Sequence, residues 1–93
     1  MDKPEQKEGW YLTKSLKEKF EQDEEFAIQI LECMAKFLKH DWGITCKEDC
    51  KHNDRSVKTG DSIVAKYETK LGNIFIITEK GQEITTILFT NEY

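Results

Sequence analysis

The spacing of apolar residues along the sequence changes at Ile63, and this change restricts the fold more than any other feature. From Ile63 apolar and polar residues alternate, with Ala65 and Tyr67 on the same side as Ile63. The runs "IFIIT" (74–78) and "ITTILF" (84–89) follow, and the turn-forming stretches "KLGN" and "EKGQE" separate the three segments. Short loops between such β-branched runs are typical of antiparallel hairpins. The last third of the chain is therefore predicted to be a three-stranded meander.

A long helix is predicted before this region. Asp23 is a suitable N-cap, and Glu24 and Glu25 favour the positive end of the helix dipole. Between Phe26 and Leu38 the apolar residues cover an arc that is wider than one core-facing stripe. We expect such a helix either to lie near the centre of the fold or to carry a second contact surface.

Two shorter elements complete the prediction. The stretch "GWYLT" (9–13) is predicted to be a brief edge strand, followed by a helical turn in which Leu16 and Phe20 share a face. Residues 46–60 predict a short amphipathic helix that ends at Gly60.

The predicted fold class is α+β. A three- or four-stranded, mainly antiparallel sheet packs against the N-terminal and central helices, in one domain at residues 9–93 that follows a flexible tail at residues 1–8. Because strand 74–78 is apolar on both sides, it also carries apolar side chains on the face away from the helices, and something has to cover them. That face is either covered by the N-terminal strand and the tail or available as an interface.

The charge and the cysteine content narrow the classes of partner. A net charge of −4 argues against a general nucleic-acid binder, which needs clustered Lys and Arg to neutralise phosphates. The start "MDKPEQKEGW" lacks the apolar core of a signal peptide, and no stretch approaches the roughly 18 apolar residues of a membrane span. Three cysteines without a secretory context indicate free thiols in a reducing cytoplasm. We expect a cytoplasmic protein with neither nucleic acid nor membrane as its direct partner.

The segment "KHDWGITCKEDC" (39–50) concentrates reactive side chains. Cys46 and Cys50, with His40 and His52, are ligand types of a zinc site. On a helix, however, His52 points about 200° away from Cys50, and the chain has no second cysteine pair. A catalytic thiolate needs an activating base and an orienting acid, and no such motif is recognisable. We expect no metal site, catalytic group or cofactor, and we keep metal binding only as an alternative.

A structural corner is the favoured interpretation of the "HDWG" part of this segment. Trp42 is predicted to fold back over the preceding helix and to bury a large apolar surface. Asp41 is expected to accept backbone N–H groups at the start of the next helix, Gly43 to let the chain turn, and His40 to suit the negative end of the long helix.

Candidate partner contacts are predicted on loops and on one solvated helix face, because small domains tend to bind through such positions. They comprise the acidic turn before the long helix, one face of the second helix and the tip of the last hairpin. The residues are Asp23, Glu24, Glu25, Asp49, Asn53, Asp54, Lys80, Gln82 and Glu83.

The order of the segments "YLTKSL", "HDWG", "EDCKHND", "IVAKY", "IFIITE" and "TTILFTNEY" resembles a family of small uncharacterised bacterial proteins, some of which are called plasmid-related. The likeness covers Tyr11 to Tyr93. In the family an Asp-Arg-Ser turn follows the Thr-Glu strand, whereas this chain has residues 80–83 there, and Phe75 stands where Trp is common. The resemblance implies a mobile-element context and no defined activity.

Together these features predict a non-enzymatic protein-binding module of a mobile element. The concrete form of this hypothesis is an inhibitor of a bacterial defence complex such as a CRISPR effector, with a host or defence-system protein as partner. One alternative is a homodimeric regulatory or structural protein of plasmid maintenance, which associates through its apolar sheet face. The other is a small metal-binding protein.

Overall fold

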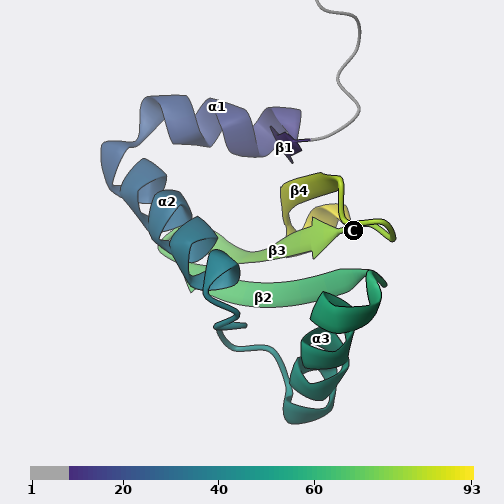
Figure 1. Cartoon of the computed structure of the whole chain (residues 1–93). Helices are drawn as coiled ribbons and strands as arrows, with labels where there is room; N and C mark the ends of the chain where they lie inside the picture. The colour runs from purple at the N-terminus through teal and green to yellow at the C-terminus, as the bar shows by residue number, and fades with distance from the viewer. Residues whose placement is uncertain (1–8) are drawn as a thin grey trace, which may run out of the picture.

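The computed structural model describes residues 9–93, so the predicted tail at residues 1–8 lies outside the described part of the chain. The described residues form a four-stranded sheet, three α-helices and a C-terminal 3₁₀ turn (Figure 1). In chain order the elements are β1 (Gly9–Leu12), α1 (Lys14–Gln22), α2 (Glu24–Leu38), α3 (Lys47–Thr59), β2 (Ile63–Thr69), β3 (Gly72–Thr78), β4 (Ile84–Phe89) and η1 (Thr90–Glu92).

The three C-terminal strands form the predicted antiparallel meander, and β1 joins it as a fourth strand. The order across the sheet is β1-β4-β3-β2, so β1 and β2 are its edges. β1 runs parallel to β4, with Trp10 opposite Thr85 and Leu12 opposite Ile87. The pairs β2–β3 and β3–β4 are antiparallel. The α+β class, the mainly antiparallel sheet and the edge position of the N-terminal strand are therefore confirmed.

The helices α1 and α2 pack on one face of the sheet (Figure 1). Asp23 separates the two helices, because its backbone is extended. Its N–H donates to the Lys19 carbonyl at the end of α1 (2.9 Å). Its carboxylate then caps α2 by accepting from the Phe26 N–H at 3.0 Å, so the predicted N-cap is confirmed. None of the helices within residues 9–93 combines the length and the apolar character that crossing a membrane requires.

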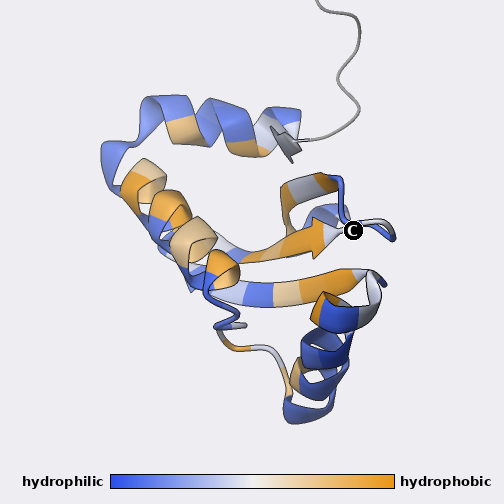
Figure 2. Ribbon diagram, viewed as in Figure 1, coloured by the Kyte–Doolittle hydropathy of each residue, from blue (hydrophilic) through white to orange (hydrophobic). Residues whose placement is uncertain are grey.

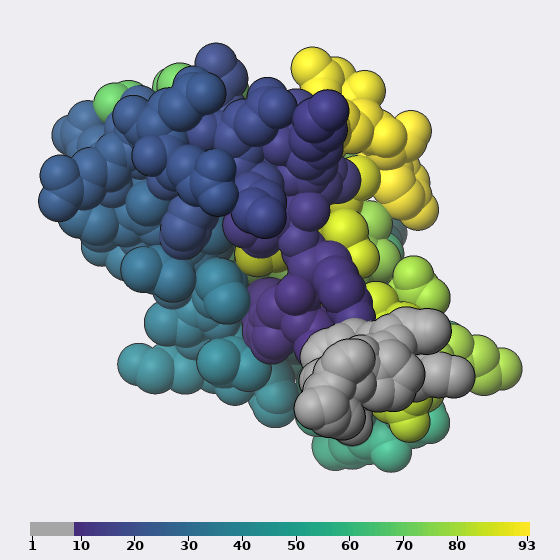
Figure 3. Space-filling model, turned by 90° about the horizontal axis from the view of Figure 1, so that it is seen from above, coloured from purple at the N-terminus to yellow at the C-terminus, as the bar shows by residue number. Residues whose placement is uncertain are grey.

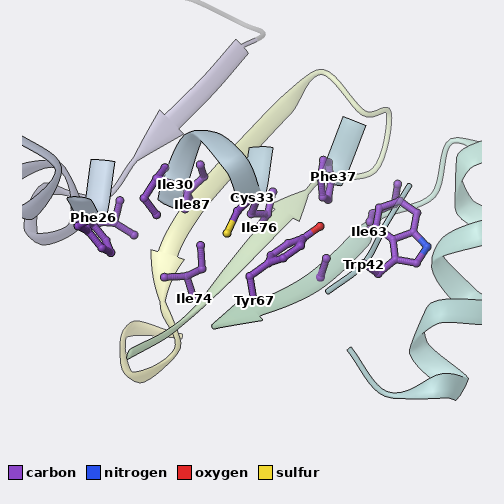
Figure 4. Packing of buried hydrophobic residues seen from close by; sticks show 12 residues of the cluster. Phe26, Ile30, Cys33, Phe37, Trp42, Ile63, Tyr67, Ile74, Ile76 and Ile87 are labelled. Carbon is purple, nitrogen blue, oxygen red and sulfur yellow. The ribbon is translucent and has the colours of Figure 1, made fainter. Parts of the chain in front are cut away.

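The core lies between α2 and the sheet. α2 turns four buried side chains towards the strands, namely Phe26, Ile30, Cys33 and Phe37 (Figure 4). Along β2, β3 and β4 buried residues alternate with more exposed ones, as the sequence period predicts. The buried apolar residues of the strands that meet α2 are Ile63, Ala65, Tyr67, Ile74, Ile76 and Ile87.

Asn53 of α3 and the segment before α3 close the outer edge of β2. The Asn53 side chain, in a residue only 1% exposed, donates to the Val64 carbonyl (3.0 Å) and accepts from the Val64 N–H (3.3 Å). The Ile44 N–H donates to the Lys66 carbonyl (2.9 Å), and the Lys66 N–H donates to the Thr45 hydroxyl (2.8 Å). Because unpaired strand edges recruit other chains, these contacts protect the middle of β2 from strand addition.

The end of α2 differs from the prediction, which placed the turn at Gly43. The chain leaves the helix at His40, which adopts the left-handed conformation with φ of 65°. Gly43 also has a positive φ of 67°, but its role is a close approach. A Cβ at this position would overlap the Tyr67 ring and the Lys66 carbonyl, so only glycine fits there.

The remaining corner residues confirm one prediction and correct another. Trp42 is 5% exposed, packs edge-on against Phe37 with ring centroids 5.4 Å apart, and donates from Nε1 to the Asp54 carboxylate at 2.9 Å. Asp41 accepts from the Gly43 N–H at 3.1 Å. It therefore stabilises the corner itself and does not cap α3, whose N-cap is Cys46.

Candidate functional site

The face of the sheet that lies away from α1 and α2 retains apolar side chains that are partly exposed. The register places on this surface, which we call the open sheet face, the residues Val64, Lys66, Phe75, Ile77 and Ile84. All five are half-buried, whereas the residues between them on the same strands are buried. Thr86 lies on the same face opposite Ile77, and Leu88, opposite Phe75, is buried there. Figure 2 shows the apolar character of β3, the strand at the centre of this face. β1 lengthens the sheet at its edge and does not cover this face.

The C-terminal turn covers one end of the open sheet face. η1 packs against β3, and the Tyr93 ring lies edge-on to Phe75 with centroids 5.3 Å apart. Glu92 fixes the turn by accepting from the Thr13 hydroxyl (2.9 Å), from the Ser15 hydroxyl and from the Phe89 N–H (2.8 Å). The hydrogen bond from Ser15 lowers the pKa of Glu92, and the other two act in the same direction. Figure 3 shows the C-terminal turn in yellow beside the start of α1 in purple.

A pocket of about 280 Å³ lies where the open sheet face meets the segment before α3. Its walls are apolar and charged side chains, with the residues Ile44, Thr45, Cys46, Asp49, Val64, Lys66 and Phe75. The Lys66 ammonium lies over the Phe75 ring, 5.9 Å from its centroid, in the geometry of a cation–π contact. The pocket is large enough for one apolar side chain, and Asp49 at its wall can meet a basic group beside that side chain.

A second pocket, of about 250 Å³, lies beside the end of α2 and is lined in part by the aromatic residues Trp10, Phe37, His40 and Trp42. Phe37 packs edge-on against both Trp10 and Trp42, and His40 stacks on Trp42. These rings are part of the core packing, and the chain enters β1 beside them. We assign no ligand to this pocket.

The reactive side chains of the segment 39–50 do not converge. Within residues 9–93 no group of three or more His, Cys, Asp or Glu side chains is arranged to hold a metal ion. Cys50 donates to the Thr45 carbonyl (3.5 Å), His52 pairs with the Ser56 hydroxyl (3.2 Å), and Cys46 is exposed. Desolvation raises the pKa of Cys50, which disfavours the thiolate that metal binding or nucleophilic attack requires.

Two of the three predicted contact residues of the acidic turn, Asp23 and Glu25, make contacts within the fold. Asp23 and Glu25 form ion pairs with Lys70 in the β2–β3 turn, at 3.1 and 2.7 Å. The hydrogen bond from the Phe26 N–H, followed by the bond from Lys70, lowers the pKa of Asp23. These contacts join the hairpin to the start of α2, while Glu24 stays exposed.

Among the remaining predicted contacts, the prediction that Asn53 lies on a solvated face is wrong, because Asn53 is buried against the edge of β2. Asp54 is engaged by the indole of Trp42. The Gln82 amide donates to the carbonyls of Ser56 (2.7 Å) and Asp61 (3.0 Å), which fixes the hairpin tip to the end of α3.

Three further predicted contacts, Asp49, Lys80 and Glu83, are exposed, and Asp49 is the one that lines the pocket of the open sheet face. The predicted set omits Phe75, Ile77 and Ile44. The signal for the first two was present in the sequence, since "IFIIT" places apolar residues at successive positions of one strand.

The comparisons with known proteins return no likeness: no family model, no curated protein and no solved structure matches the chain. The choice of a contact surface therefore depends on the geometry described above.

Proposed function

We propose that the chain is a non-enzymatic protein-binding module and that the open sheet face is its contact surface. The observation that carries this proposal is the partial exposure of Val64, Phe75 and Ile77 on a face that the helices leave uncovered. Exposed apolar surface bordered by polar residues is characteristic of interaction sites. The alternation along β3 supports the same assignment, because Ile74 and Ile76 are fully buried on the opposite face.

The pocket beside Phe75 indicates the chemistry of the partner. An apolar side chain of the partner enters this pocket, as anchor residues do in protein interfaces. Basic groups of the partner lie opposite Asp49, and the net charge of −4 favours the approach of a positively charged surface.

The resemblance to mobile-element proteins directs the choice of partner. The module inhibits a component of a bacterial defence complex, such as a CRISPR effector, by covering one of its surfaces in the cytoplasm. An inhibitor of this kind blocks its target at stoichiometric amounts. Inhibition at far lower, catalytic amounts would count against a binding mechanism.

The test is a tagged pull-down from nuclease-treated bacterial lysate with three forms of the chain. The natural chain is expected to retain one protein in stoichiometric amount, and Phe75→Glu is expected to lose it. Leu71→Glu is the matched control, because Leu71 is an exposed apolar residue in the β2–β3 turn, outside the open sheet face. Urea unfolding of both variants shows whether they are folded. A partner that a folded Phe75→Glu variant still retains would contradict the proposal.

A further inference from the structure

The helix α2 has a second apolar stripe on the side that faces away from the sheet. Ile28, Leu31 and Leu38 are 50%, 54% and 67% exposed, and Ala35 is exposed between them. The core stripe of the same helix is buried, so α2 is apolar on two sides. Figure 2 shows that α2 is mostly apolar along its length, whereas α1 and α3 are mostly polar.

The spacing of the outer stripe is that of a coiled-coil seam. Ile28, Leu31, Ala35 and Leu38 follow one another at steps of three, four and three residues, which are the a and d positions of a heptad repeat. The steps read the same from either end of the helix. A stripe of this kind can therefore face its own copy across a two-fold axis, as a symmetric dimer interface requires.

The charges beside the stripe decide the orientation of such a pair. Glu25 lies in the first turn of α2 and Lys39 is its C-cap, and both flank the outer stripe on the same side as Glu32 near the middle of the helix. A parallel pair aligns the two helix dipoles, which disfavours it. An antiparallel pair opposes the dipoles and places Glu25 of each copy near Lys39 of the other.

We propose that two copies of this chain associate through the outer stripes of α2, antiparallel and across a two-fold axis. Ile28 then lies opposite Leu38 of the second copy and Leu31 opposite Ala35. Glu25 lies near Lys39 of the second copy, and the two Glu32 side chains lie close to each other beside the axis. The helix layers meet at the centre of the dimer, and both open sheet faces point outwards. The proposed function does not depend on this association, since it uses the other side of the molecule.

The size of the contact sets its strength. A helix of 15 residues is about 22 Å long and about 10 Å across, so one helix face covers far less than the roughly 800 Å² per partner of a standard interface. The dimer is therefore expected to dissociate on dilution. This concentration dependence separates it from a permanent dimer with a large interface.

Sedimentation equilibrium of the full chain over a concentration series tests the proposal. The natural chain is expected to shift from monomer to dimer mass as its concentration rises. Leu31→Glu should raise the dissociation constant at least about tenfold, because each dimer contains the buried charge twice. Ile44→Glu is the control: Ile44 is 50% exposed, like Ile28, but it lies at the open sheet face. A monomer at every concentration, or a dimer that Ile44→Glu disrupts and Leu31→Glu does not, overturns the proposal.

Charge reversal tests the antiparallel orientation. Glu25→Lys and Lys39→Glu should each weaken the dimer, because each single change places like charges on facing helices. Glu25→Lys also removes the ion pair with Lys70, so urea unfolding of each variant accompanies the measurement. The double variant restores opposite charges across the axis and should return the dissociation constant close to that of the natural chain. A double variant no tighter than the singles, measured with both singles folded, overturns the antiparallel arrangement.

Discussion

The two faces of β3 differ in burial although their side chains are similar. Ile76 is fully buried against α2, whereas its neighbour Ile77, on the opposite face, is half-buried. The core lies on the first face, between the helix layer and one side of the sheet, although Leu88, opposite Phe75, is buried on the second face as well. The half-buried apolar residues of the second face, Phe75 and Ile77, are the ones that the proposed function assigns to binding.

The largest expected effect separates these two faces directly. Ile76→Ala removes a fully buried side chain and should lower the free energy of unfolding by about 2 to 5 kcal/mol. Ile77→Ala makes the same chemical change one residue away and should cost less, about 1 kcal/mol, because part of that side chain is already in contact with water. Urea unfolding of the two variants at one pH measures the difference. Equal losses would mean that the open sheet face is packed as tightly as the core.

A substitution at Gly43 tests the close packing of the corner after α2 against β2. Gly43→Ala should lower the free energy of unfolding by about 2 to 3 kcal/mol, since the new Cβ overlaps the Tyr67 ring and φ is positive. Gly60→Ala is the control, because Gly60 also has a positive φ but has open space around it. Its loss should be nearer 1 kcal/mol. Thermal unfolding of both variants distinguishes steric overlap from backbone strain. If Gly43→Ala lowers the free energy of unfolding no more than Gly60→Ala does, steric overlap with Tyr67 is not the cause of its effect.

Asn53 tests the closed edge of β2. Asn53→Ala leaves the Val64 N–H and carbonyl without their partners and should cost about 1 to 3 kcal/mol. Asp49→Ala, at an exposed position on the same helix, should stay within about 0.5 kcal/mol of the natural chain. Denaturant unfolding measures both. If Asn53→Ala also behaves like an exposed position, water replaces the amide and the edge is less protected than described.

The smallest expected effect concerns pH and the C-terminal turn over the open sheet face. The hydrogen bond from Ser15 lowers the pKa of Glu92 from its usual value of 4.5, so the carboxylate stabilises the fold above that value. This contribution is lost as pH falls through the lowered pKa, because the folded state must then take up a proton it binds weakly. Glu92→Gln should make the urea midpoint less sensitive to pH below about 5, and Ser15→Ala should act in the same direction but less. An unchanged pH dependence in Glu92→Gln would show that the turn is not held by this carboxylate.

Most of the fold follows from local pattern. The alternation from Ile63 and the two β-branched runs after it predicted the meander, and Asp23 predicted the start of α2. The parallel pairing of β1 with β4 could not be predicted, because nothing near residues 9–13 specifies a partner at the other end of the chain.

The candidate site was harder to predict than the fold. Asn53 reads as a solvated polar residue in the sequence, and only the tertiary structure places its amide against the backbone of β2. The wide apolar arc of α2 was compatible with a central helix or with a second surface. In the structure α2 packs on one side only, which leaves Ile28 and Leu31 exposed.

The most direct test of the central claim is carbene footprinting of the free chain and of the complex captured from lysate. The account predicts that residues 72–78 are labelled in the free chain and protected in the complex, with the strongest protection at Phe75 and Ile77. If the labelling of these residues is unchanged in the complex and protection appears elsewhere on the chain, the open sheet face is not the binding surface.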